Sequence, residues 1–203
     1  MLNRRHFLSV AAGGVALAGL APRLGFAQQL TQQEVFHDPD APVLGNPKGD
    51  VTVVEFFDYQ CPYCKKSHPD VEAAVSEDGN VRLIMKDWPV FGDVSVFAAQ
   101  AVLGANEIGL YKPAMEALMA TQGSLSEDKV RSVLSTAGID MGKVTTALQQ
   151  NNQKISDLLT RNYKQAVAFN FRGTPSFVIG RGTYSGVLSK DQLREAINQA
   201  RAA

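Results

Sequence analysis

The feature that most constrains this fold is an apolar run that leads directly into the only two cysteines of the chain. Val51–Phe57 is rich in β-branched and aromatic residues and carries one charge, Glu55, a composition typical of a central strand covered on both faces. The segment Cys61–Cys64, of sequence Cys-Pro-Tyr-Cys, follows, and its proline suits the first turn of a helix. The sequence therefore predicts a buried strand that enters a helix, with both thiols at the junction.

The chemistry expected of Cys61 follows from this position. The N-terminus of a helix presents unpaired N–H groups and a partial positive charge, both of which stabilise a thiolate. The thiolate is the form of cysteine that attacks in disulfide exchange. We therefore expect Cys61 to be the attacking cysteine, because it should be more exposed than Cys64 and more stable as an anion. Cys64, one helical turn later, is close enough to form a disulfide with Cys61 and to resolve a mixed disulfide.

Two other interpretations of the cysteine pair are weaker. A structural disulfide with so short a loop would gain only about 2 kcal/mol, against about 4.7 kcal/mol for a loop of about 100 residues. A zinc site needs four ligands, but the chain has no second cysteine pair, and beyond residue 27 its only histidines are His37 and His68. His68 lies on the face of Cys64 and is interpreted as a solvated helix residue rather than a catalytic base. A redox-active pair with no metal and no cofactor is the favoured interpretation.

Residues 1–27 have the features of an export signal rather than of a folded segment. They combine a basic start, a weakly apolar middle and small residues before a cleavage site after Ala27. The segment Asn3–Leu8, with paired arginines before Phe and Leu, resembles the twin-arginine export signal; an ordinary secretory signal with a chance arginine pair is the alternative. Either signal predicts that the chain leaves the cytoplasm, and no other apolar run is long enough to span a membrane.

The charge balance argues against one class of partner. The signal carries three of the 20 basic residues and no acid, which leaves 17 basic against 20 acidic residues and a net charge of −3 after cleavage. There is no basic stripe, so nucleic-acid binding is not expected. An exported chain whose two cysteines both lie in one Cys-x-x-Cys segment favours exchange over a structural role for them.

The rest of the chain divides into a lead-in and one domain. Residues 28–50 are polar and broken by turn signals, so we expect an extended lead-in with at most one short edge strand around Val43-Leu44; a short oligomerising helix over Leu30–Phe36 is a further possibility. Residues 51–203 predict a βαβ unit with parallel strands, a helical insertion at about 94–171, a hairpin and a last helix. The expected segments are a helix over Pro62–Ser76, a strand over Val81–Lys86, a strand over Gly173–Gly180, its partner at Tyr184–Gly186, and a helix over Leu193–Arg201 that Ser189–Gln192 caps.

In this order the segments resemble the disulfide bond protein A (DsbA) family of thioredoxin-fold oxidoreductases, over essentially the whole chain after residue 27. Cys61 and Cys64 match the family's active-site pair, Glu55 matches a buried acid below it, and Thr174-Pro175 matches a loop with a cis-proline. The resemblance implies an α/β, thioredoxin-like fold with an inserted all-helical subdomain. It also implies that Glu55 carries protons to and from Cys64, whereas a partly exposed acid near the sheet edge is the alternative.

The resemblance further implies how substrates and partners are bound. Thr174 and Pro175, with Pro62 and Tyr63, would contact the substrate, whose chain pairs through main-chain hydrogen bonds as in strand addition. The substrates would be exported proteins with cysteine thiols in the periplasm. The redox partner would be a membrane protein, either a quinone-linked oxidase or a thiol donor, and the chain itself would not insert stably into a membrane.

Thr174 leaves the direction of exchange open. The best-known oxidases of the family have valine at this position, whereas threonine is more usual in isomerases and reductases. By resemblance the Thr174 side chain lies against the Cys61 sulfur, where its hydroxyl can donate a hydrogen bond to the thiolate. Threonine here and the Cys-Pro-Tyr-Cys segment also resemble the suppressor-of-copper-sensitivity subgroup. Copper binding by the two thiolates is therefore an alternative function.

Overall fold

The computed structural model describes residues 31–202, so the predicted export signal at residues 1–27 lies outside the described part of the chain. The strands are β1 (Val43–Gly45), β2 (Val51–Phe57), β3 (Val81–Asp87), β4 (Ser176–Ile179) and β5 (Gly182–Ser185). They form one sheet in the order β1-β3-β2-β4-β5, in which β2 runs parallel to β3 and antiparallel to β4. Every residue of β2 except Thr52 is buried, so the predicted central strand is confirmed.

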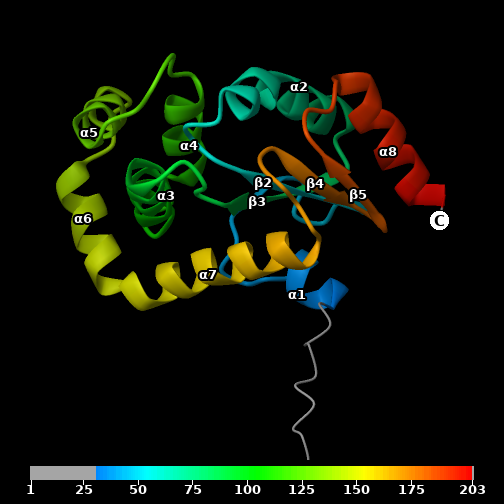
Figure 1. Ribbon diagram of the computed structural model, residues 1–203, viewed down its shortest axis with the longest axis horizontal. Helices are drawn as coiled ribbons and strands as arrows, with labels where there is room; N and C mark the ends of the chain where they lie inside the picture. Colours follow the sequence, from blue (N-terminus) through cyan, green and yellow to red (C-terminus); the bar gives the residue numbers. More distant parts are fainter. Residues whose placement is uncertain (1–30, 203) are drawn as a thin grey trace, which may run out of the picture.

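Helices cover both faces of this sheet. They are α1 (Gln32–Phe36), α2 (Pro62–Asp78), α3 (Asp93–Asn106), α4 (Tyr111–Met119), α5 (Glu127–Thr136), α6 (Met141–Gln150), α7 (Asn152–Ala168) and α8 (Lys190–Ala202). Figure 1 shows α2 and α8 on one side of the sheet, α1 and α7 on the other, and α3 to α6 beside it. Because α3 to α7 connect β3 to β4, the predicted α/β fold with an inserted helical subdomain is confirmed.

Local sequence explains where α2 begins and ends. Cys61 is its N-cap and Pro62 its first residue, as predicted, and Gly79 ends it in the left-handed conformation with a φ of 72°. The helix is longer than predicted, because it continues through Asp78 instead of stopping at Ser76. The predicted capping box before α8 is also present, since the side chains and N–H groups of Ser189 and Gln192 bond reciprocally.

The lead-in is part of the packed domain. β1 is the edge strand expected around Val43-Leu44, and it pairs antiparallel with β3. α1 forms where a short oligomerising helix was one expectation, but its apolar side chains Val35 and Phe36 are buried in the core of the same chain. Among the described helices, none combines the length and the apolar character needed to cross a membrane.

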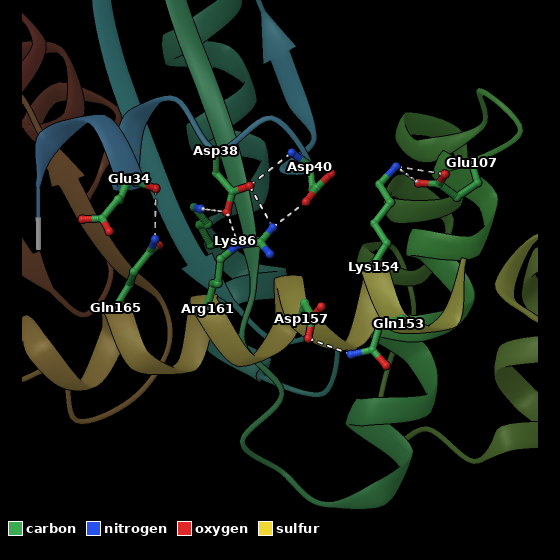
Figure 2. Close-up of polar contacts among 10 residues, drawn as sticks. All are labelled: Glu34, Asp38, Asp40, Lys86, Glu107, Gln153, Lys154, Asp157, Arg161 and Gln165. Atoms are coloured by element: carbon green, nitrogen blue, oxygen red, sulfur yellow. Dashed lines mark hydrogen bonds and ion pairs between the residues drawn. The ribbon is translucent and has the colours of Figure 1, made fainter. Parts of the chain in front are cut away.

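A network of ion pairs ties the lead-in and the insertion to the sheet (Figure 2). The Nζ of Lys86 on β3 lies 3.3 Å from Oδ2 of Asp38, and both side chains are almost completely buried. Arg161 on α7 donates to both carboxylate oxygens of Asp38 at 3.0 Å and to Asp40 at 2.6 Å. Burial lowers the pKa of Lys86, and the negative charge of Asp38 opposes this shift. The buried ammonium group therefore depends on Asp38 as its counter-ion.

Asp38→Ala is expected to destabilise the protein strongly, because it leaves the ammonium group of Lys86 unpaired in the core. Removing one partner of a buried ion pair costs about 3–5 kcal/mol. The matched control is Glu77→Ala, which breaks an exposed pair with Lys190 and should cost about 1 kcal/mol or less. Denaturant unfolding of both variants measures the two free-energy losses, and similar losses would contradict the role of Asp38.

Candidate active site

A buried carboxylate fixes the turn that precedes the two thiols. Asp58 directly follows β2, and its carboxylate accepts hydrogen bonds from the N–H groups of Gln60 and Val90, both at 2.7 Å, and from the hydroxyl of Ser95 at 2.8 Å. Its carbonyl oxygen accepts from the N–H of Cys61 at 3.1 Å. An aspartate that bonds the backbone two residues on stabilises a turn, and this turn places Cys61 at the start of α2. No role for Asp58 was predicted from the sequence.

Both thiols are free and lie at the N-terminus of α2. The Sγ of Cys61 accepts a hydrogen bond from the N–H of Cys64 at 3.3 Å, and it lies 3.2 Å from the carbonyl oxygen of Thr174, to which its S–H can donate. The expected difference in exposure is almost absent, since the exposed fraction is 1% for Cys61 and 0% for Cys64. Thr174 packs against Cys61, so exposure does not distinguish the two thiols.

Their pKa values do distinguish them. The pKa of Cys61 is lowered to about 6, first by the side chain of Cys64, against the opposing effect of burial, and then by Thr174 and by the backbone of Cys64 and Tyr63. Burial raises the pKa of Cys64 far above its ordinary value, and the Cys61 sulfur and the charge of Glu55 raise it further. Near pH 7, Cys61 is therefore mostly a thiolate and Cys64 a thiol that can donate to it.

Glu55 lies in the middle of β2, paired with Met85 of β3 and Phe177 of β4. It is completely buried, and neither carboxylate oxygen has a hydrogen-bond partner among the described residues. Burial raises the pKa of Glu55 to about 8, and the negative charge of Cys61 adds to the increase. The predicted burial is confirmed and the exposed position near the sheet edge is wrong, because a strand pairs with β2 on each side. At pH 7 the carboxyl is mostly neutral and can supply a proton.

The loop before β4 contains the expected cis peptide bond, between Thr174 and Pro175. The hydroxyl of Thr174, however, has no hydrogen-bond partner within residues 31–202. The hydroxyl therefore does not reach full hydrogen-bond geometry with the Cys61 sulfur, and the direct contact with that sulfur comes from the carbonyl oxygen of Thr174. The hydroxyl still lies close enough to the sulfur to lower the pKa of Cys61, but by less than the side chain of Cys64 does.

Pro62 and Tyr63 lie exposed beside the thiols, and Tyr63 has 63% of its surface accessible. Pro62 also forms part of a groove of about 740 Å³ that begins at the active-site turn. The groove is further lined by Gln60, Lys65, Lys66, Phe91 and the loop 121–124. Exposed apolar side chains and a groove in this place can contact a polypeptide whose cysteine reaches Cys61.

His68 differs from its expected position. It was expected in solvent, but it is only 6% exposed, because its side of α2 faces α4. Burial lowers its pKa, against the effect of the nearby carboxylate of Glu72, whose Oε2 lies 3.6 Å from Nε2 of His68. The imidazole is therefore neutral at pH 7, packed between two helices.

Asp87 is a buried acid to which the sequence interpretation assigned no function. It ends β3, and burial raises its pKa to about 7, against the opposing effect of Tyr59. The hydroxyls of Tyr59 and Tyr111 are buried close enough to this carboxyl to lower its pKa, although none of the three groups reaches full hydrogen-bond geometry with a described residue. The only sequence signal for this cluster was an acid at the end of an apolar strand.

Comparison with known proteins agrees with this geometry. The family model described as Thioredoxin matches residues 37–199. The thiol:disulfide interchange protein DsbA of Burkholderia cepacia is 30% identical over 185 residues, which cover 87% of this chain and 81% of that protein. A solved thioredoxin-like oxidoreductase from Silicibacter pomeroyi DSS-3 is 38% identical with a TM-score of 0.82, over 86% of this chain and 99% of that one. The catalytic domain of Proteus mirabilis ScsC is 25% identical with a TM-score of 0.76, over 84% and 94%.

The chain belongs to the thioredoxin family. Its likeness to DsbA and to the solved oxidoreductase from Silicibacter pomeroyi places it, within that family, among the thiol–disulfide oxidoreductases of the DsbA type. The chain spans only about a quarter of the length of two other curated relatives, which are named Na⁺/H⁺ antiporters of Salinispora arenicola and Salinispora tropica. It covers 27% and 28% of these proteins at 25% identity.

Glu55→Gln is expected to change how stability depends on pH. A carboxyl whose pKa is raised to about 8 in the folded state contributes its stability fully below its unfolded pKa, about 4.3, and loses it as the pH rises through 8. The free energy of unfolding of the wild type should therefore fall over this range relative to the variant, which cannot titrate. At about 1.4 kcal/mol per pKa unit, the difference is at most about 5 kcal/mol.

Denaturant unfolding of the disulfide forms, from about pH 5 to about pH 8, measures this difference without titration of Cys61. The reduced forms should show a larger difference, because the thiolate of Cys61 also raises the pKa of Glu55. A difference between wild type and Glu55→Gln that is independent of pH would show that this carboxyl does not have a raised pKa.

Proposed function

We propose that the protein exchanges disulfides with the thiols of exported proteins through Cys61 and Cys64. The observation that supports this most strongly is the opposite shift of the two thiol pKa values at the N-terminus of one helix. Near neutral pH only Cys61 is then both a nucleophile and a good leaving group. Disulfide exchange needs this division of roles. One sulfur must attack the partner disulfide and later leave as a thiolate, while the other stays protonated until it resolves the mixed disulfide.

In the oxidising direction, a substrate thiolate attacks the Cys61 sulfur of the enzyme disulfide. The bond between Cys61 and Cys64 breaks, a mixed disulfide forms, and Cys64 leaves with the electron pair. The carboxyl of Glu55 is neutral at this stage, and it gives Cys64 a proton and recovers one from solvent. Once ionised, Glu55 would raise the pKa of Cys64. A second substrate thiolate attacks the substrate sulfur of the mixed disulfide, and Cys61 leaves as a thiolate. Two electrons have then passed from the substrate to the enzyme.

The low pKa of Cys61 favours this direction, because a stabilised thiolate stabilises the reduced enzyme and makes its disulfide more oxidising. A quinone-linked membrane partner would then restore the disulfide. An isomerase or reductase would instead be kept reduced by a membrane thiol donor. Alkylation of acid-quenched cells reports the redox state of Cys61 and Cys64. A mostly oxidised pair supports the oxidase, and a mostly reduced pair supports the isomerase or reductase.

Copper binding by the same two thiolates is the alternative function. Among residues 31–202, no group of three or more His, Cys, Asp or Glu side chains is placed to hold a metal ion. A copper ion would therefore take only the two sulfurs as clustered ligands from the described part of the chain. Stoichiometric copper binding without disulfide turnover would favour this function over exchange.

Replacement of Cys64 should allow the first step of exchange, in which Cys61 forms a mixed disulfide, but block the second step, in which Cys64 resolves it. Cys64→Ala and Cys64→Ser both lack the resolving thiol, so each should accumulate mixed disulfides on Cys61 when mixed with a disulfide-containing protein. Cys61→Ala should form none, because the remaining thiol has a strongly raised pKa. Non-reducing electrophoresis measures the trapped species, and abundant adducts on Cys61→Ala would contradict the assignment of Cys61 as the attacking residue.

The same variants test the cause of the low pKa. The alkylation rate of wild-type Cys61 should have its midpoint near pH 6. It should move to a higher pH in Cys64→Ala, which lacks the neighbouring donor, and lie between the two in Cys64→Ser, which keeps a hydroxyl. Equal midpoints in the wild type and Cys64→Ala would mean that Cys64 does not lower this pKa.

A periplasmic location, reached through residues 1–27, completes the proposal. Its support is the arginine pair Arg4-Arg5 ahead of a weakly apolar segment, together with the likeness to DsbA.

The double variant Arg4→Lys with Arg5→Lys should leave uncleaved precursor in the cytoplasm, because the twin-arginine export route recognises the arginine pair. Cell fractionation and the size of the protein measure this. Undiminished export of the double variant would indicate the general secretory route instead, and cytoplasmic retention of the wild-type chain would contradict the periplasmic location.

A further inference from the structure

The groove beside the active site carries charge of one sign only. It starts at Gln60 and Pro62, and both of its ionisable lining residues, Lys65 and Lys66, are basic. Thr174 and Pro175 do not line it. The groove is therefore distinct from the loop at which the main chain of a substrate is proposed to pair.

The ammonium groups on this side lack carboxylate partners among the described residues. The Nζ of Lys65 donates to the hydroxyl of Thr121 at 2.9 Å, and the Nζ of Lys129 donates to the carbonyl oxygen of Gln122 at 2.6 Å. Lys65 also donates to the carbonyl oxygen of Gly123, and Lys129 to that of Ser124. An ammonium group has three N–H donors, so each of these two lysines keeps one N–H group without a partner among the described residues. Lys66 is exposed on α2.

Asp58, the acid whose charge acts on Lys65, is already committed to other partners. The carboxylate of Asp58 accepts four hydrogen bonds from the active-site turn, the following loop and α3. Partial burial lowers the pKa of Lys65, and the positive charge of Lys129 lowers it further, against the charges of Asp58 and Cys61. A carboxylate that entered the groove would offset the repulsion between the two lysines and accept their remaining N–H groups.

The groove is also preformed and tied to the nucleophile. Gln60, next to Cys61, donates from Nε2 to the carbonyl oxygen of Phe91 at 3.1 Å and accepts at Oε1 from the N–H of Leu125 at 3.2 Å. The Gln60 side chain therefore holds two groove-lining segments, the loop at Phe91 and the loop that ends before Leu125, in place relative to the active-site turn. Phe91 is 52% exposed, and it and Pro62 add apolar surface to the lining of the groove.

We propose that this groove binds the segment of a substrate protein next to its reactive cysteine, and that Lys65 and Lys66 select segments with an aspartate or glutamate there. The occupant is an extended chain with an acidic side chain toward the lysines and an apolar one on Phe91. This inference rests on the proposed function and names its substrate class. Lys66 is the specificity-determining residue to test, because it is exposed. Its replacement leaves the hydrogen bonds of Gln60 that hold the groove in place.

Three dithiol peptides that differ at one residue beside the first cysteine, as Glu, Gln or Lys, test the inference on the disulfide form of the full chain. The measurement is the second-order rate of enzyme reduction, followed by rapid acid quench and mass spectrometry. The residue also alters the thiol of the peptide itself, so each rate ratio is compared between enzyme variants. A contact between exposed charges corresponds to about a twofold to fivefold change in rate.

Relative to the wild type, Lys66→Gln should lower the ratio of the Glu-peptide rate to the Lys-peptide rate, and Lys66→Glu should lower it further. The matched control is Lys143→Glu, which makes the same change in net charge at an exposed position on α6, outside the groove. It should keep the wild-type ratio. Added salt should bring the wild-type ratio closer to that of Lys66→Gln, because it screens exposed charges.

An unchanged ratio in Lys66→Glu would overturn the inference, while normal rates with the Gln peptide would leave the proposed function standing. An equal fall of the ratio in Lys143→Glu would also overturn it, because the cause would then be the net charge of the protein. No reaction with any of the three peptides would overturn the proposed function itself.

Discussion

The site depends first on the carboxylate of Asp58. It accepts hydrogen bonds from the N–H groups of Gln60, Val90 and Phe91 and from the hydroxyl of Ser95. One ion thus joins the end of β2, the turn before Cys61, the loop after β3 and the first turn of α3. Hydrogen bonds to an ionised acceptor are stronger than neutral ones, so a single buried group can hold four segments. The helix start that stabilises the Cys61 thiolate and the groove beside it both follow from this arrangement.

The second constraint is that only one of Cys61, Cys64 and Glu55 carries a negative charge near pH 7. Cys61, Cys64 and Glu55 are all buried, and burial disfavours the anion of each. Only Cys61 receives enough compensation, from the Cys64 thiol and the backbone, to be ionised near pH 7. Its charge then raises the pKa values of the other two groups. When Cys61 and Cys64 form a disulfide, the thiolate charge of Cys61 is lost, and it no longer repels a negative charge on Glu55. The redox state of the sulfurs and the protonation of Glu55 are therefore coupled through electrostatics alone.

Local features were predictable from the sequence because neighbouring residues determine them. The apolar run at β2, the helix that starts at Pro62 and the helical insertion all follow from periodicity and capping. Contacts between distant residues were not predictable in this way. Lys86 and Arg161 meet Asp38 across 48 and 123 positions of the chain, and no local pattern indicates such a pair.

Orientation was the other missing information. Helical spacing placed His68 on one face of α2, but it could not reveal that α4 covers this face. Resemblance placed Thr174 against Cys61, but it could not decide whether the hydroxyl or the carbonyl oxygen meets the sulfur. Both answers depend on how whole elements pack, which the sequence of one segment does not contain.

The degree of specificity that such a site can reach follows from where its charges lie. Main-chain pairing at the loop before β4 would accept almost any sequence, because every residue offers the same backbone groups. The groove can add side-chain selection, and its lysines are exposed or half-buried. A fully buried lysine would discriminate more sharply, but it would cost desolvation and need a permanent counter-ion, as Lys86 needs Asp38. Exposed lysines avoid that cost and give a modest preference. A modest preference would suit the proposed exchange with exported proteins, each of which must be released after reaction.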